Sequence, residues 1–382
     1  MSTRVLMVSD VYFPRVNGVS TSIETFRQAL APAGVDIRLV APRYGEEPDQ
    51  HGIARIGARR IPRDPEDRLL PWRETRDTVH AEAAECDLVH IQTPFIAHYA
   101  GLRAARRLDK PVLATYHTFF EEYLFHYAPF LPPAWLKGLA RRFSRTQCND
   151  LDAVVVPSTA MRDRLADYGV RAPMHVLPTG IPLSRFAKGD RARFRADHGI
   201  PEGRPVVLFV GRVAHEKNIG FLIEVVARAR RRLPELLFLV TGEGPAEKAL
   251  RQRAAALGVA EQVRFLGYLD RQHQLPDAYA AADAFIFASR TETQGLVLLE
   301  AMAMGLPVVA LAAMGTKDIL APGLGGVAAP DDVDGFAAAL ADLLEDDPKR
   351  ARLAAEARSY ARDWADDRMA GRLAELYRGL VS

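Results

Sequence analysis

Two glutamates, Glu292 and Glu300, lie on either side of a turn that the sequence places between a strand and a helix. Residues 285–287 form a short apolar run typical of a buried strand, and residues 296–304 form an apolar run typical of a helix. Free backbone N–H groups at such a helix start can bind an anion. Carboxylates flanking that site suit a nucleotide sugar, whose hydroxyls lie on both sides of a diphosphate. Two exposed glutamates at an ordinary helix start would look the same.

Two cations, Arg212 and Lys217, follow another apolar run at residues 206–210, which we predict to be a strand. Gly211 allows the chain to turn there. A guanidinium can grip two phosphate oxygens at once, and a lysine ammonium adds a point charge. The pair therefore suits a diphosphate, although charged loop residues are more often simply solvated.

Other polar or glycine-containing loops also come after predicted strands. Asn17 and Gly18 favour a tight turn with positive φ, and Ser20 can cap the helix that follows. His117 ends a predicted strand and can exchange a hydrogen bond with a sugar hydroxyl, although a lone histidine is more often structural. Loops that could shape a nucleobase slot, or be ordinary turns, contain Gly242, Gly267, Tyr268 and Leu269. The first loop lacks a Gly-x-Gly-x-x-Gly motif, which argues against a dehydrogenase.

Strand and helix patterns alternate along the chain, which is typical of doubly wound parallel sheets. A Pro- and Gly-rich junction at residues 177–182 divides the strands into two series and is the expected hinge. The predicted strands are residues 4–8, 36–40, 87–91, 111–115 and 153–156, followed by 206–210, 236–240, 262–265, 284–287 and 307–310. We expect an α/β protein with an N-terminal domain (1–182), a C-terminal domain (183–363) and a terminal helix (364–382). Ligands of such sheets bind at the carboxyl ends of the strands.

The composition is that of a soluble globular protein, with 48% hydrophobic and 26% charged residues in 382. The net charge of +2 argues against a nucleic-acid-binding protein. Cys86 and Cys148 lie in no metal-binding spacing and suit a reducing compartment. The N-terminal apolar run reads as a strand rather than a signal peptide, and no run approaches membrane-spanning length. These features predict a cytoplasmic protein.

Taken together and in order, these motifs resemble the retaining nucleotide-sugar glycosyltransferases of family 4. The resemblance rests on the Gly-Arg…Glu-Lys-Asn segment at residues 211–218 and on the paired glutamates, and it spans nearly the whole chain. It implies the GT-B fold, in which two Rossmann-like domains face a central cleft and a C-terminal helix crosses back to the N-terminal domain. The sequence is also similar to bacterial lipid glycosyltransferases that glucosylate diacylglycerol.

The resemblance implies roles for single residues. Arg212 and Lys217 would bind the diphosphate. Glu292 would hold hydroxyls of the donor sugar, Glu300 would grip the ribose, and His117 would lie near the reacting centre. The other positions that the resemblance places around the donor are Asn17, Gly18, Gly211, Gly242, Gly267, Tyr268, Leu269, Thr293, Gln294, Gly295 and Leu296.

The implied reaction moves a hexose from a nucleoside diphosphate to an acceptor hydroxyl, with retention at the anomeric carbon. Arg212, Lys217 and the helix N-terminus would stabilise charge on the leaving diphosphate, so no metal or other cofactor is expected. The donor would be a UDP- or GDP-hexose. Many relatives have Gly-Gly-x-x-Glu where this chain has a segment containing Lys317, and this departure leaves the choice of base and hexose open.

An aromatic stretch at residues 119–130 leads into a basic amphipathic segment at residues 132–145. On a helical wheel one face holds Trp135, Leu136, Leu139 and Phe143, and the other holds Lys137, Arg141, Arg142 and Arg145. Such a helix suits an anionic membrane surface, although a core-facing helix with a solvated basic side has the same pattern. We expect a lipid acceptor such as diacylglycerol and peripheral attachment to the inner face of the cell membrane.

Three other functions fit parts of the pattern. A glycosyltransferase with a soluble or polysaccharide acceptor would have a basic helix that is ordinary surface. A sugar-nucleotide epimerase on the same fold would need no acceptor groove. A non-catalytic sugar-nucleotide-binding protein is disfavoured, because it would have lost at least one of the polar residues assigned to the donor.

Overall fold

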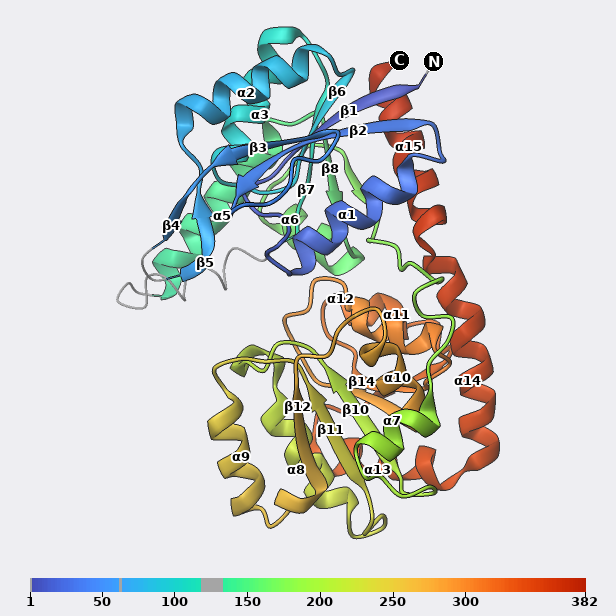
Figure 1. The fold of residues 1–382 in the computed structure, drawn as a ribbon. Coiled ribbons are helices and arrows are strands. Elements are labelled where there is room, and N and C mark those ends of the chain that lie inside the picture. Colours follow the sequence, from blue (N-terminus) through green and yellow to red (C-terminus); the bar gives the residue numbers. More distant parts are fainter. Residues whose placement is uncertain (1, 62–63, 118–132) are drawn as a thin grey trace. The chain divides into compact units, whose positions relative to one another are not determined.

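The computed structural model describes residues 2–61, 64–117 and 133–382 (Figure 1). The chain forms two compact units: unit 1 comprises Met1–Gly180 and Asp366–Ser382, and unit 2 comprises Ile181–Ala365. The sequence pattern predicts breaks after residues 182 and 363, near these positions.

Unit 1 is built on a parallel sheet with the strand order β3-β2-β1-β6-β7-β8-β9. Its strands are β1 (Thr3–Val8), β2 (Val35–Arg43), β3 (Ile53–Gly57), β6 (Leu88–Ile91), β7 (Val112–Thr115), β8 (Ala153–Val156) and β9 (Met174–Val176). An antiparallel pair, β4 (Arg59–Ile61) and β5 (Asp64–Leu69), lies outside this sheet. One face packs against α2 (Trp72–Ala84), α3 (Ile96–Leu108), α5 (Pro133–Asn149) and α6 (Thr159–Asp167). The other face packs against α1 (Gly18–Leu30) and α15 (Asp366–Val381).

The C-terminal helix α15 completes the core of unit 1, although it follows unit 2 in the sequence. Leu373 and Tyr377 are buried in the same hydrophobic cluster as Val5 and Met7 of β1. The hydroxyl of Tyr377 lies 2.6 Å from Nδ1 of His90, whose Nε2 lies 2.7 Å from the hydroxyl of Thr115. Burial lowers the pKa of His90 to about 3, so the ring is neutral. The expected return of the terminal helix to the N-terminal domain is confirmed.

Unit 2 is a second parallel sheet, in the order β12-β11-β10-β13-β14-β15. Its strands are β10 (Val206–Val210), β11 (Leu237–Thr241), β12 (Val263–Gly267), β13 (Ala284–Phe287), β14 (Val308–Leu311) and β15 (Gly326–Ala329). Its α-helices are α7 (Arg191–Asp197), α8 (Ile219–Ala229), α9 (Glu247–Ala256), α10 (Gln274–Ala281), α11 (Leu296–Ala303), α12 (Gly315–Leu320), α13 (Val333–Glu345) and α14 (Asp347–Ala361). Every residue of β10, β11 and β13 is buried. Strands covered on both faces read as continuous apolar runs, which made them predictable.

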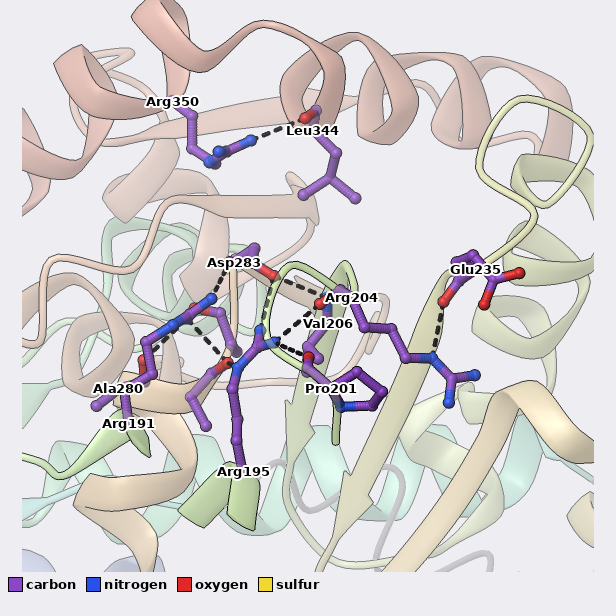
Figure 2. A network of polar contacts seen from close by, with 12 residues as sticks. Arg191, Arg195, Pro201, Arg204, Val206, Glu235, Ala280, Asp283, Leu344 and Arg350 are labelled. Atoms are coloured by element: carbon purple, nitrogen blue, oxygen red, sulfur yellow. Dashed lines mark hydrogen bonds and ion pairs between the residues drawn. The ribbon is translucent and has the colours of Figure 1, made fainter. Parts of the chain in front are cut away.

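Two arginines, the buried Arg195 and the exposed Arg191, fasten the amino ends of two central strands of unit 2 (Figure 2). Asp283, just before β13, accepts a hydrogen bond from Arg195 at 3.1 Å and another from the backbone N–H of Val206 at 2.8 Å. Arg191 donates to the other carboxylate oxygen of Asp283 at 2.8 Å. Because Val206 begins β10, this network fixes β10 and β13 together at the edge opposite to the predicted donor site.

Candidate functional site

The loops that follow β10 and β11 in unit 2 pack backbone against backbone. The N–H of Val213 donates to the carbonyl of Glu243 at 2.9 Å. Gly242 has a φ of +116°, and a Cβ there would lie 2.0 Å from the carbonyl oxygen of Gly211. Glycine is therefore required at position 242, both for its conformation and for the close approach. This packing fixes the loop that carries Arg212.

The two predicted diphosphate-binding cations are both paired with carboxylates. Nζ of Lys217 donates to Oε2 of Glu292 at 2.6 Å, and both side chains are mostly buried. The more exposed Arg212 donates to Glu216 at 2.8 Å. Burial is the largest single effect on Glu216 and raises its pKa, but the hydrogen bonds from Arg212 and from its own backbone N–H, together with the charges of Arg212 and Lys217, leave the pKa lowered. The structure thus brings Lys217 and Glu292 together, from the loops after β10 and β13.

Helix α11 begins directly after the turn that contains Glu292. Gly295 is its N-cap, with a φ of +95°. The carbonyl of Glu292 accepts from the N–H of Gly315 at 2.9 Å, and a Cβ at Gly315 would lie 2.2 Å from the carbonyl of Thr293. The turn, with Thr293, Gln294, Gly295 and Leu296, is therefore held against the start of α12. Lys317, which departs from the family pattern, is exposed on α12.

The second glutamate, Glu300, has two polar partners that the sequence did not indicate. Its carboxylate forms an ion pair with Arg271 and accepts a hydrogen bond from the hydroxyl of Tyr279 at 2.9 Å. The charge of Glu300 raises the pKa of Arg271. A carboxylate this deeply buried requires such partners. Arg271 follows β12 and Tyr279 lies on α10, so only the fold shows that they meet.

The segment expected to flank the base lies at the end of β12. Gly267 has a φ of +73°, and its carbonyl accepts hydrogen bonds from the N–H of Gly242 at 2.8 Å and the hydroxyl of Thr241 at 3.0 Å. Tyr268 is 58% exposed, whereas Leu269 is buried in the core. An exposed ring beside a glycine turn can stack with a planar group. Leu269 supports this turn by packing beneath it.

The Asn17–Gly18 loop of unit 1 differs from the sequence-based expectation. Oδ1 of Asn17 accepts a hydrogen bond from the N–H of Ser20 at 2.8 Å, so Asn17 caps α1 and the prediction for Ser20 is wrong. Gly18 is the first helical residue and does not have positive φ, because the cap already turns the chain. A Cβ at Gly18 would meet nothing within 4 Å. The backbone there is open to a close approach.

His117 lies just after β7 and belongs to a buried polar group at the carboxyl edge of the unit 1 sheet. Its Nε2 lies 3.0 Å from Oε1 of Gln92, which follows β6. Burial lowers the pKa of His117 to about 4, so the ring is neutral at pH 7. Thr93, the residue after Gln92, donates a hydrogen bond from its hydroxyl to the carboxylate of Asp10 at 2.7 Å. Burial raises the pKa of Asp10 to about 6. Sequence reasoning missed Gln92 and Asp10, although each follows a predicted strand.

The apolar face predicted for α5 is divided between the core and solvent. Leu136 and Ala140 are buried in the core and Phe143 packs against it, whereas Trp135 is 79% exposed and Leu139 57% exposed. The apolar residues span a wide arc around α5, and only the part of this arc around Leu136 packs into the core. Arg141 lies over the ring of Tyr168, 5.4 Å from its centroid. The aromatic stretch at 119–130 lies outside the described residues, and none of the described helices could span a bilayer.

Comparison with known proteins identifies the family. The profile of "Glycosyltransferase Family 4" matches residues 16–185, and that of "Glycosyl transferases group 1" matches residues 190–360. The chain belongs to glycosyltransferase family 4. This family 4 enzyme is 33% identical to an alpha-monoglucosyldiacylglycerol synthase of Streptococcus pneumoniae, over 80% of its own length and 70% of the relative's. It is 31% identical to a GDP-mannose-dependent alpha-mannosyltransferase of Mycobacterium tuberculosis, over 94% of its own length and 93% of the relative's.

Solved structures place the family 4 glycosyltransferase in the GT-B fold. Anabaena HepE, crystallised with UDP and glucose, matches with a TM-score of 0.78 at 20% identity, over 99% of this chain and all of HepE. WaaG, a glycosyltransferase involved in lipopolysaccharide biosynthesis, matches with a TM-score of 0.73 at 20% identity, over 98% of this chain and all of WaaG. The two-domain α/β prediction is therefore confirmed.

Proposed function

We propose that this glycosyltransferase transfers a hexose from a UDP- or GDP-sugar to the hydroxyl of a membrane lipid such as diacylglycerol, with retention of configuration. The single observation that carries the proposal is the Lys217–Glu292 pair in front of α11. It joins a cation suited to a diphosphate with a carboxylate suited to sugar hydroxyls. The start of α11 supplies a third element, because the first N–H groups of a helix point out of its end; among them, that of Leu298 already donates to the carbonyl of Gly295 at 3.0 Å.

The leaving diphosphate would be stabilised by this chain's own groups. Lys217 and Arg212 can each exchange a carboxylate partner for phosphate oxygens, and the positive end of the α11 dipole adds to them. Glu292, released from Lys217, would then accept hydrogen bonds from the donor sugar. Transfer should accordingly be unaffected by EDTA, and loss of activity on chelation would contradict this part of the proposal.

Glu300 is proposed to hold the ribose. Arg271 donates to one carboxylate oxygen of Glu300 and Tyr279 donates to the other. Each of these oxygens keeps a further lone pair that can accept a hydrogen bond from a ribose hydroxyl. His117 is proposed to meet a sugar hydroxyl near the reacting carbon. Because Oε1 of Gln92 only accepts, Nε2 of the neutral ring carries the proton and Nδ1 remains as the acceptor for that hydroxyl.

The lipid acceptor is supported by the surface of α5 and by relatives. Trp135 and Leu139 expose large apolar side chains on a helix that also exposes Lys137 and Arg142, a combination suited to an anionic bilayer surface. The names of two relatives, from Streptococcus pneumoniae and Acholeplasma laidlawii, describe synthesis of monoglucosyldiacylglycerol. The GDP-mannose named for other relatives keeps mannose among the candidate donors.

The test is a transfer assay with UDP-glucose and GDP-mannose, with and without anionic vesicles containing diacylglycerol. Vesicle-dependent product that extracts into organic solvent would support the proposal, and the NMR coupling of its anomeric proton would report retention. Donor turnover that vesicles do not change would favour a soluble acceptor. Conversion of the donor to an epimer, without transfer, would overturn the proposal.

A further inference from the structure

A small hollow lies between α2 and α3 of unit 1, and none of the residues that line it is assigned to the sugar donor. Its volume is about 40 Å³, enough for more than one water-sized group. The residues that line it are Arg76, Asp77, His80, Arg103, Ala104 and Arg107. Arg76 and His80 lie one turn apart on α2, and Arg103 and Arg107 lie one turn apart on the adjacent α3 (Figure 1).

The hollow has an excess of positive charge. Asp77, the one acid in its lining, pairs with its neighbour Arg76 at 2.7 Å. Within the described residues, neither Arg103 nor Arg107 has a hydrogen-bond or ion-pair partner, and both are exposed. Nearby guanidiniums without a counter-charge repel one another, and an anion between them would remove that repulsion.

His80 adds an independent observation. Its Nδ1 is buried and has no hydrogen-bond partner among the described residues. A buried polar atom without a partner is destabilising, and the neutral imidazole carries one N–H that it can donate. His80 is one of the residues that line the hollow.

We infer that the hollow binds a phosphate group. Guanidiniums grip tetrahedral oxyanions through paired N–H donors, and three of them around one small space match a phosphate better than a planar carboxylate. The phosphate could belong to a lipid headgroup or be free in solution. Trp72 and Tyr99 lie one turn before Arg76 and Arg103, and both are partly exposed, as suits a headgroup at a bilayer surface.

Titration calorimetry with inorganic phosphate tests the site without sugar donor or acceptor, so the result does not depend on the proposed activity. Replacing the two unpaired arginines (Arg103→Gln with Arg107→Gln) should weaken phosphate binding at least about tenfold. Arg59→Gln with Arg60→Gln, exposed on β4, removes the same charge elsewhere and should leave affinity unchanged. Lack of saturable binding to the wild type, or equal loss in both double variants, would overturn the site.

Vesicle binding distinguishes the two sources of phosphate. Both double variants would be compared on phosphatidylcholine vesicles with and without phosphatidylglycerol. A lower affinity of the Arg103–Arg107 variant for the anionic vesicles, relative to the control, would identify a headgroup. Loss of inorganic phosphate binding with vesicle affinity equal to that of the control would identify a free phosphate.

Discussion

Nζ of Lys217 lies 2.6 Å from Oε2 of Glu292, so the cation proposed for the diphosphate and the carboxylate proposed for the sugar neutralise each other in the unliganded protein. A bound donor must separate them or share them. The two residues therefore should respond differently to substitution.

Glu292→Gln should lower kcat for transfer by about a hundredfold or more while nucleoside diphosphate affinity is kept or raised, because Lys217 becomes free for phosphate. Single-turnover kinetics and calorimetry with UDP and GDP would measure the two effects. Asp334→Asn, which removes a carboxylate from an exposed ion pair with Arg228 in the same unit, is the control for charge. Normal turnover in Glu292→Gln would refute the sugar-binding role.

Arg212→Ala and Lys217→Ala should each weaken nucleoside diphosphate binding by about tenfold, since each removes a charge-assisted contact to phosphate. Arg228→Ala, which breaks an exposed ion pair with Asp334, is a matched control in the same unit and should bind normally. If neither site variant changes the dissociation constant of UDP or GDP, the diphosphate lies elsewhere.

Gln92 should control the protonation of His117. In Gln92→Glu, a carboxylate facing Nε2 would favour the imidazolium, raise the pKa of His117 and move the acid limb of the pH–activity profile to higher pH. Gln92→Leu removes the acceptor and should lower transfer without that displacement. Identical pH profiles for wild type and Gln92→Glu would exclude a catalytic contribution from His117 protonation.

Acid should destabilise unit 1. Burial lowers the pKa values of His90, His98 and His117 to about 3, 4 and 4, so each histidine favours folding above pH 6.5 and loses that contribution as the pH falls. Between pH 7 and pH 5 the contribution of each histidine to the free energy of unfolding falls by about 2 kcal/mol. Asp10 has a raised pKa and acts in the opposite direction, offsetting about 1 kcal/mol.

Urea unfolding at pH 7 and pH 5 would measure this loss. His98→Phe keeps a ring at a buried site and removes the titrating group. Between pH 7 and pH 5 the free energy of unfolding of this variant should therefore fall by about 2 kcal/mol less than that of the wild type. An unchanged pH dependence in this variant would show that His98 does not contribute.

Trp135→Ser with Leu139→Ser should reduce binding to anionic vesicles while leaving the unfolding free energy within about 0.5 kcal/mol of wild type, because both side chains are exposed. These sites test the surface better than Arg141, which packs over Tyr168. Leu257→Ser, another exposed leucine, is the control in unit 2. Equal vesicle binding by the double variant and wild type would make α5 ordinary surface.

The sequence predicts elements whose two faces are both buried, but it does not predict which residues meet across the fold. The apolar run of β13 and the glycine before α11 locate Glu292 correctly, because each is a local signal. Residue spacing gives no such signal for the contact between Arg271 and Glu300, which lie on different elements. The same limit applies to α5: its apolar residues span a wide arc of the wheel, and only packing against the core decides that Leu136 is buried while Trp135 is exposed.

Unit 1 is discontinuous in sequence, and this has a consequence for biogenesis. A ribosome makes residues 1–180 first, but the chain lacks Tyr377, the partner of His90, and the side chains of Met369 and Leu373 until α15 emerges. During all of that time the apolar face beside β1 is open to solvent, chaperones or other nascent chains. A premature stop codon between residues 182 and 365 would therefore damage the first domain that was translated as well as the second.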